Sequence, residues 1–192
     1  MKKTLLLLYI LFISYTPAYS QSTWFWQQPL PTGNFLYAVD FLNENTGYAV
    51  GTVGTIMKTS NGGTNWSVQN SNFSSELLGM GFYDTELGFA VGGNNGSILR
   101  TSNGGLNWTG VSSGLTTFMN DVDFPTRNTG YAVGLNGVIL KSTNSGISWF
   151  ALNSSTSASL ICVSFLDSLN GVAGGNRIVL KTTNGGITWV SQ

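Results

Sequence analysis

The amino-acid sequence predicts an all-β fold built from a repeated unit of four short strands. Tryptophans recur every 40 to 42 residues, at Trp66, Trp108, Trp149 and Trp189. Within each period, short apolar runs alternate with turns rich in Gly and Asn, which is the pattern of strands joined by tight hairpins. Glycine accounts for 25 of the 192 residues, and charged residues for only 8%, against about 25% in ordinary globular domains.

The N-terminal segment has the pattern of an export signal. Lys2 and Lys3 precede an apolar run at residues 5–13, which is too short to span a bilayer. Ala18-Tyr19-Ser20 then carries small residues at both ends, as a signal-peptidase site requires. We expect residues 1–20 to be a signal peptide. The alternative, an uncleaved membrane anchor, is disfavoured by the short apolar run and the cleavage site that follows it.

Cleavage between Ser20 and Gln21 would leave residues 21–192 as a mature chain without an integral membrane segment. The loss of Lys2 and Lys3 leaves six basic and eight acidic residues, a net charge of −2. This balance gives no electrostatic footprint for a nucleic acid. We therefore expect an exported protein, located in the periplasm, at the cell surface or outside the cell.

The mature chain divides into an N-terminal segment and four repeats. Each repeat contains a Phe, then Gly-Tyr/Phe/Val-Ala with a following Val-Gly in three copies, and then a box that ends in Trp. The expected boundaries are an outer strand at 21–35 and repeats at 36–76, 77–117, 118–158 and 159–192, the last of them cut short.

Each repeat is expected to form four strands. In the second repeat the apolar alternation places Leu78, Met80 and Phe82 on one face of the first strand, with Gly79 and Gly81 on the other. Turn-forming residues divide this repeat into strands at about 77–82, 87–92 and 97–101 and a fourth from Trp108.

A period near 41 residues without helical periodicity is the length of a four-stranded β-propeller blade. The segment Trp24–Gln28 matches the strand that follows the box Trp in the repeats, which gives five candidate fourth strands for four copies of strands one to three. A closed four-bladed ring needs only four. We therefore expect an incomplete, truncated β-propeller, with a closed four-bladed ring as the alternative.

The box Ser/Thr-x-Asn-x-Gly-x-x-Trp has a structural logic. The hydroxyl and the Asn amide can satisfy backbone groups of a turn, the Gly relieves a strained position, and the Trp can fill the space between neighbouring sheets. Stacked repeats need such residues for their shared core. The box residues are Thr59, Asn61, Gly63 and Trp66; Thr101, Asn103, Gly105 and Trp108; Ser142, Asn144, Gly146 and Trp149; and Thr182, Asn184, Gly186 and Trp189.

These four boxes resemble Asp-boxes of the BNR type, with Asn in place of Asp. Together with the Gly-Tyr-Ala-Val-Gly strand, the period resembles the repeat of the photosystem II stability/assembly factor family and its non-photosynthetic relatives. The resemblance covers residues 21–192 and implies a β-propeller. It implies no single function, because propellers with this box include sialidases, sorting receptors and assembly factors. The photosynthetic role is associated with an arginine-rich patch, whereas this chain has three arginines.

The sequence lacks the residues of common catalytic sites. It has no His and one Cys, which excludes His-dependent triads, His-ligated metals and Cys-cluster zinc sites. A sialidase would need an arginine triad, but Arg127 and Arg177 lie in turns. Arg100 shares its repeat position with lysines and is expected to be a solvated strand residue. Cys162 lies on the first strand of the fourth repeat, at the position of Ala38, Gly79 and Asp121, and is expected to be a small residue in a tight place. It is not expected to be a nucleophile, because no His is available to activate it.

Three carboxylates are the remaining candidates for a binding site. Asp40, Asp121 and Asp123 fall on first strands, which line the central channel in propellers. An acidic channel could bind a cation or a polar ligand, although solvation at the channel mouth is the simpler interpretation. No phosphate loop, dinucleotide motif or metal cluster is present, so we expect no cofactor and no metal.

The sequence therefore predicts an exported, non-catalytic scaffold that binds a protein or glycan partner. Polar loops at about 69–76, 111–117 and 153–157 are the candidate recognition surfaces. One alternative is a carbohydrate-active, sialidase-like enzyme. Another is a photosystem II assembly factor, as the family label suggests.

Export can be tested directly on the native protein. N-terminal sequencing of the protein isolated from the host envelope or medium is expected to begin at or near Gln21, because the signal peptide would be removed during export. A soluble cytoplasmic product that retains Met1 would contradict this prediction.

Overall fold

The computed structural model describes residues 31–93 and 95–192, and the regular secondary structure of this part is almost entirely β-strand. In this part of the chain, sixteen strands form four antiparallel sheets of four strands, which we call blades A to D in chain order. Each strand pairs with its neighbour along the chain, so every blade is a simple meander. The expected signal peptide and the expected strand at Trp24–Gln28 lie outside the described residues.

The four blades have nearly the same dimensions. Two short 3-10 turns, η1 (Thr52–Gly54) and η2 (Leu135–Gly137), follow the second strands of blades A and C. Blade A contains β1 (Leu36–Phe41), β2 (Gly47–Gly51), β3 (Ile56–Thr59) and β4 (Ser67–Gln69). Blade B contains β5 (Leu77–Phe82), β6 (Gly88–Gly92), β7 (Ser97–Thr101) and β8 (Thr109–Val111). Blade C contains β9 (Met119–Asp123), β10 (Gly130–Gly134), β11 (Ile139–Ser142) and β12 (Phe150–Leu152). Blade D contains β13 (Leu160–Phe165), β14 (Gly171–Gly175), β15 (Ile178–Thr182) and β16 (Val190–Ser191).

The predicted strands of the second repeat are confirmed, with one error of alternation. Strands β5 and β7 have the predicted bounds, and β6 begins one residue later than predicted. The prediction that Leu78 shares a face with Met80 is wrong. A β-bulge between Leu77 and Gly79 shifts the register, so that Leu77 and Met80 lie together in the core. An extra residue in one strand displaces the alternation on one side of the bulge.

The recurring glycine that opens each second strand is required by an aromatic ring. Gly88 pairs with Phe82 across β5 and β6, and a Cβ atom on Gly88 would lie 2.2 Å from that ring. The equivalent Cβ atoms on Gly47 and Gly130 would lie 2.8 Å and 2.2 Å from their own phenylalanine rings. Any side chain here would displace the ring, which explains why glycine and phenylalanine recur together along the sequence.

Each blade packs its front face, which we define as the face toward the next blade in the chain, against that blade's rear face. The front of blade A, through Tyr48, Val50 and Ile56, meets the rear of blade B, which includes Met80 and Trp108. Equivalent clusters join blades B to C and C to D. The second strands of blades B and C are therefore buried on both faces, since one side packs forward and the other backward.

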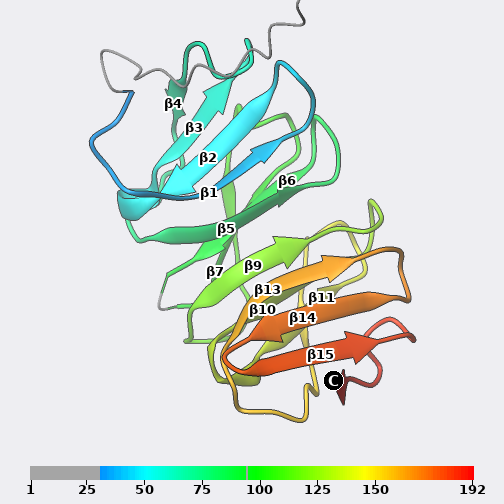
Figure 1. Ribbon diagram of the computed structural model, residues 1–192. Helices are drawn as coiled ribbons and strands as arrows, with labels where there is room; N and C mark the ends of the chain where they lie inside the picture. The colour runs from blue at the N-terminus through cyan, green and yellow to red at the C-terminus, as the bar shows by residue number, and fades with distance from the viewer. Residues whose placement is uncertain (1–30, 94) are drawn as a thin grey trace, which may run out of the picture.

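The four blades form an open arc, an incomplete β-propeller. Figure 1 shows blades A and D at opposite ends of the arc, and the innermost strands β1, β5, β9 and β13 follow one another along it. The rear of blade A is uncovered within the described part of the chain. Val39 is 62% exposed, whereas Met80, Val122 and Val163 at the same repeat position are 7%, 3% and 6% exposed. The alternative of a closed four-bladed ring is wrong for this structure.

Within residues 31–93 and 95–192, none of the helical segments has the length and apolar character needed to cross a bilayer.

The different environments of the box tryptophans give a stability prediction. Trp108→Ala is expected to lower the free energy of unfolding by about 3–5 kcal/mol, because the indole is buried between two blades. Trp66→Ala is expected to cost clearly less, because Trp66 lies half-buried on the uncovered rear face of blade A. Equilibrium denaturation of both variants measures the difference. Equal losses would contradict the assignment of Trp66 to an open face.

Candidate functional site

The box residues of every blade are engaged in holding their own turn. In blade B, Thr101 Oγ1 accepts hydrogen bonds from the backbone N–H groups of Asn103 at 3.3 Å and Gly105 at 2.9 Å. The Thr101 hydroxyl donates to Asn103 Oδ1 at 3.0 Å, and the same oxygen accepts from the Asn107 N–H at 3.0 Å. The other three boxes repeat this pattern. The polar side chains of each box are therefore engaged in hydrogen bonds that close their own turn.

The box tryptophans pack edge-on against phenylalanine rings. Trp108 meets Phe82 with ring centroids 6.1 Å apart and ring planes at 89°, and blades A, C and D contain equivalent pairs. The indole nitrogens of Trp108, Trp149 and Trp189 are buried without a hydrogen-bond acceptor. Edge-to-face packing is a favourable arrangement for the two aromatic rings. The tryptophans therefore close the blade interfaces and do not present their N–H groups to a ligand.

Basic residues on the third strands connect each blade to the next. Lys58 Nζ donates to the carbonyl oxygen of Gly104 at 2.7 Å, and Lys141 Nζ donates to that of Gly185 at 2.7 Å. The prediction that Arg100 is a solvated strand residue is wrong, because its Nε donates to the Ser145 carbonyl at 2.8 Å. Each acceptor is a carbonyl in the box of the following blade. The recurrence of a cation at one repeat position was the sequence signal for this role.

Two tyrosines reinforce the same contacts. The hydroxyl of Tyr48 donates to the Gly104 carbonyl at 2.8 Å, and that of Tyr131 donates to the Gly185 carbonyl at 3.0 Å. Lys58 Nζ also lies 5.3 Å from the centre of the Tyr48 ring, within reach of a cation–π interaction. Burial raises the pKa of Tyr131 to about 12 and lowers the pKa of Lys141.

The candidate carboxylates also bridge neighbouring blades. Asp40 Oδ2 accepts from the Phe82 N–H at 3.3 Å. Asp121 and Asp123 accept from the N–H groups of Val163 at 2.9 Å and Phe165 at 2.6 Å. Burial raises the pKa of all three carboxyl groups. The blades form an open arc, so the role of these residues in lining a channel stays a prediction.

The B–C interface replaces these carboxylates by glycines. A Cβ atom on Gly79 would lie 2.3 Å from the Asn120 carbonyl oxygen, and one on Gly81 would lie 2.5 Å from that of Val122. The innermost strands of blades B and C therefore approach too closely for any side chain at these positions. No carboxylate is found there because the backbone itself fills the gap.

The remaining reactive residues do not gather into a common site. Arg127 pairs with Asp84 at the surface, and Arg177 lies exposed in the turn between β14 and β15. The prediction of a tight place for Cys162 is wrong: its side chain is exposed on the front of blade D, which no described blade covers. No cluster of three or more His, Cys, Asp or Glu residues suited to a metal occurs within the described residues.

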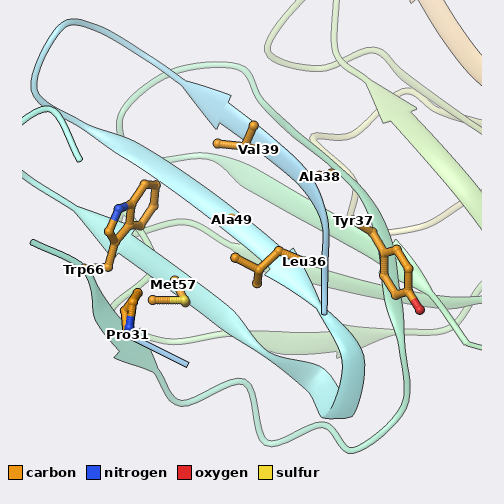
Figure 2. Close-up of a pocket in the computed structure, with 8 residues that line it drawn as sticks. All are labelled: Pro31, Leu36, Tyr37, Ala38, Val39, Ala49, Met57 and Trp66. Carbon is orange, nitrogen blue, oxygen red and sulfur yellow. The ribbon is translucent and has the colours of Figure 1, made fainter. Parts of the chain in front are cut away.

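An apolar groove lies on the rear face of blade A. It has a volume of about 390 Å³, and Figure 2 shows its side chains spread over β1, β2 and β3. Trp66 and Pro31 lie at one end, and Tyr37 lies at the other. The lining residues are Pro31, Leu36, Tyr37, Ala38, Val39, Ala49, Met57 and Trp66. Its chemistry suits apolar contact and offers no acid–base pair.

The blades, their boxes and the bonds between them define the chain as a β-propeller of the BNR repeat class. The sequence profile of the family described as "Photosynthesis system II assembly factor YCF48" matches residues 16–114 and 107–191. The chain belongs to this family. The predicted resemblance is thereby confirmed.

Solved structures with the same fold include two members of that family. The structure titled "YCF48 bound to D1 peptide" has a TM-score of 0.68 at 22% sequence identity, and the match covers 85% of this chain and 54% of that chain. YCF48 from Cyanidioschyzon merolae gives a TM-score of 0.64 at 25% identity, covering 85% and 57%. The chain thus spans about half the length of these solved proteins.

Enzymes are also among the structural neighbours. An ancestral GH74 enzyme gives a TM-score of 0.69 at 21% identity, and the match covers 88% of this chain but 25% of the enzyme. The likeness at this identity concerns the fold alone. No curated protein matches the chain.

The buried carboxylates predict an unusual dependence of stability on pH. The pKa of Asp123 lies above its ordinary value of 3.8 in the folded protein because of burial, so its contribution to stability falls as the pH rises through that raised pKa. Asp123→Asn removes the buried charge and keeps an oxygen for the Phe165 N–H. We expect the variant to be at least as stable as the wild type at pH 7, and to lose this relative advantage by about pH 4.

A surface carboxylate provides a control of opposite sign. Hydrogen bonding from Asn170 lowers the pKa of the exposed Asp167, so its contribution is present at neutral pH and is lost on acidification. Asp167→Asn should therefore destabilise the protein at pH 7 and have a fading effect towards acid. Denaturant titrations at several pH values measure both trends. Parallel trends in the two variants would contradict the burial argument.

Proposed function

We propose that this protein is an exported, non-catalytic scaffold that binds a protein partner through its loops and turns. The proposal rests on the observation that the charged groups between the blades hydrogen-bond to the backbone of the next blade. Asp40, Asp121 and Asp123 hold backbone N–H groups of the next blade, and Lys58, Arg100 and Lys141 hold carbonyls of the next blade. Residues already committed to such bonds are poorly placed to move protons in a reaction.

The loops between blades are the favoured recognition surface. The loop at 69–76 lies beside the β2–β3 turn, and the Gly54 N–H donates to the Ser75 carbonyl at 2.6 Å. In blade B the Gly96 N–H donates to the Thr117 carbonyl at 2.7 Å in the same way. A polar hollow of about 610 Å³ lies along the loop of blade A. Loops fixed on a rigid framework are the usual sites of recognition.

The family name suggests a photosynthetic partner, but the charges argue for another one. A related YCF48 has been solved with a D1 peptide. In this chain Arg100 is engaged between blades and Arg127 pairs with Asp84, while Arg177 lies apart in a turn of blade D. These three arginines form no shared surface that could receive a peptide by charge. We propose a non-photosynthetic protein partner in the cell envelope or outside the cell.

The alternative function is a carbohydrate-active enzyme, which the fold likeness to a GH74 enzyme favours. The pair Asp121 and Asp123 on β9 is the nearest approach to a catalytic pair, and the charge of Asp123 contributes to the raised pKa of Asp121. Both carboxylates accept backbone N–H groups of β13, and these structural bonds argue against either of them acting as the acid or nucleophile of a glycosidase.

Two measurements on the purified mature chain test the proposal. Incubation with a panel of aryl glycosides and polysaccharides should release no reducing sugar above the blank. Immobilised protein should retain a specific partner from an envelope extract of its host, and replacement of residues 111–117 by a Gly/Ser linker of equal length should reduce that retention. Turnover that Asp121→Asn abolishes would favour the enzyme, and tight binding of the D1 peptide would favour the photosynthetic role.

A further inference from the structure

The two ends of the arc carry the two halves of one interface. Within the described chain, blade–blade contact occurs three times in the same form, with a front face against a rear face. In residues 31–93 and 95–192, no other blade packs on the rear of blade A or on the front of blade D. The internal interfaces therefore specify what each of these faces is built to contact.

The rear of blade A has the same kinds of residues with which the rear faces of blades B to D contact the preceding blade. Leu36 is 45% exposed, whereas Leu77 at the same position of blade B is fully buried. Phe41 is 46% exposed, while Phe124 in blade C is 6% exposed. These side chains differ from their internal counterparts in exposure and not in character. Gly62 occupies the box position whose carbonyl, in the later blades, accepts from the preceding blade's cation, and it too is exposed.

The front of blade D has the cation and the apolar residues with which the other front faces contact the next blade. Lys181 occupies the position of Lys58 and Lys141, whose ammonium groups bond to the next box, but Lys181 is exposed. Val172 and Val179 stand at the positions of buried aromatic and isoleucine residues and are 44% and 47% exposed. The face is thus apolar with one cation at its edge, as on the internal front faces.

We propose that the rear face of blade A binds the front face of blade D of a second copy of this chain. In this head-to-tail contact Lys181 of one copy donates to the Gly62 carbonyl of the other, and Val172 and Val179 cover Phe41 and Val39. Continuity with the three internal interfaces supports this occupant. The contact is heterologous, because different surfaces meet, and it can repeat from copy to copy.

Three substitutions make this contact weaker than the internal ones. Val172 replaces the Tyr or Phe that stacks on the next blade's phenylalanine, as Tyr48 stacks on Phe82 with centroids 4.1 Å apart. Gly174 replaces a buried valine, and Ser164 replaces the bridging aspartate. The association is therefore reversible and concentration-dependent, whereas the internal interfaces are parts of one chain.

The test measures the molar mass of the purified chain by sedimentation velocity over a wide range of protein concentration. The wild type should associate as its concentration rises. Val39→Glu on the rear face and Lys181→Glu on the front face should each remain monomeric, and their mixture should form a dimer and nothing larger, because each variant keeps one working face. Leu106→Glu is the control, since Leu106 is 74% exposed on an internal blade and lies on neither end face.

A gain-of-contact variant addresses the same interface from the other side. Val172→Tyr restores the aromatic ring and its hydroxyl, and should tighten the association about tenfold through stacking and one hydrogen bond. The same change combined with Val39→Glu should leave the protein monomeric. A monomeric wild type at every concentration would overturn the proposal. Association that survives either glutamate variant would also overturn it, because the contact would then use other surfaces.

Discussion

The hydrogen bond from a third-strand cation to the next blade's box carbonyl ties the local structure to the arc. The box turn must first be closed by its own Thr and Asn before its carbonyl can face the preceding blade. Lys58, Arg100 and Lys141 then reach that carbonyl from the same position of successive blades. Because the cation donates its hydrogen bond to a backbone carbonyl oxygen, it needs no carboxylate as a partner. Each of these contacts, beside an apolar core, helps to fix the position of the next blade.

The sequence predicted the blades well because their determinants are local. The strands at 77–82 and 97–101 follow from apolar runs between turn residues, and the period follows from the tryptophans. The bulge after Leu77 could not be predicted, because the residues around it have the same apolar and glycine-rich character as those of a regular strand. Val53 adopts a φ of 57° that valine rarely takes, and nothing in its neighbours along the chain indicates this turn.

The candidate site was less predictable because its contacts cross between repeats. Arg100 was expected in solvent, but its acceptor lies 45 residues away in the box of blade C. Cys162 was expected in a tight place, and it is exposed because no described blade follows blade D to cover it. In a repeat protein the environment of a residue depends on its blade's neighbours as much as on its own blade.

The scarcity of charge follows from the same geometry. A blade with neighbours on both sides buries both faces of its second strand, as Phe89 and Ala90 do towards opposite blades. Only the edges, the turns and the outermost strand then remain in water. Charged residues that do lie between blades must find a partner, and here they bind backbone groups: carboxylates accept N–H groups and cations donate to carbonyls. A chain that uses its few charges in this way holds its blades together with them, and the loops remain the part of the molecule that can vary without loss of the fold.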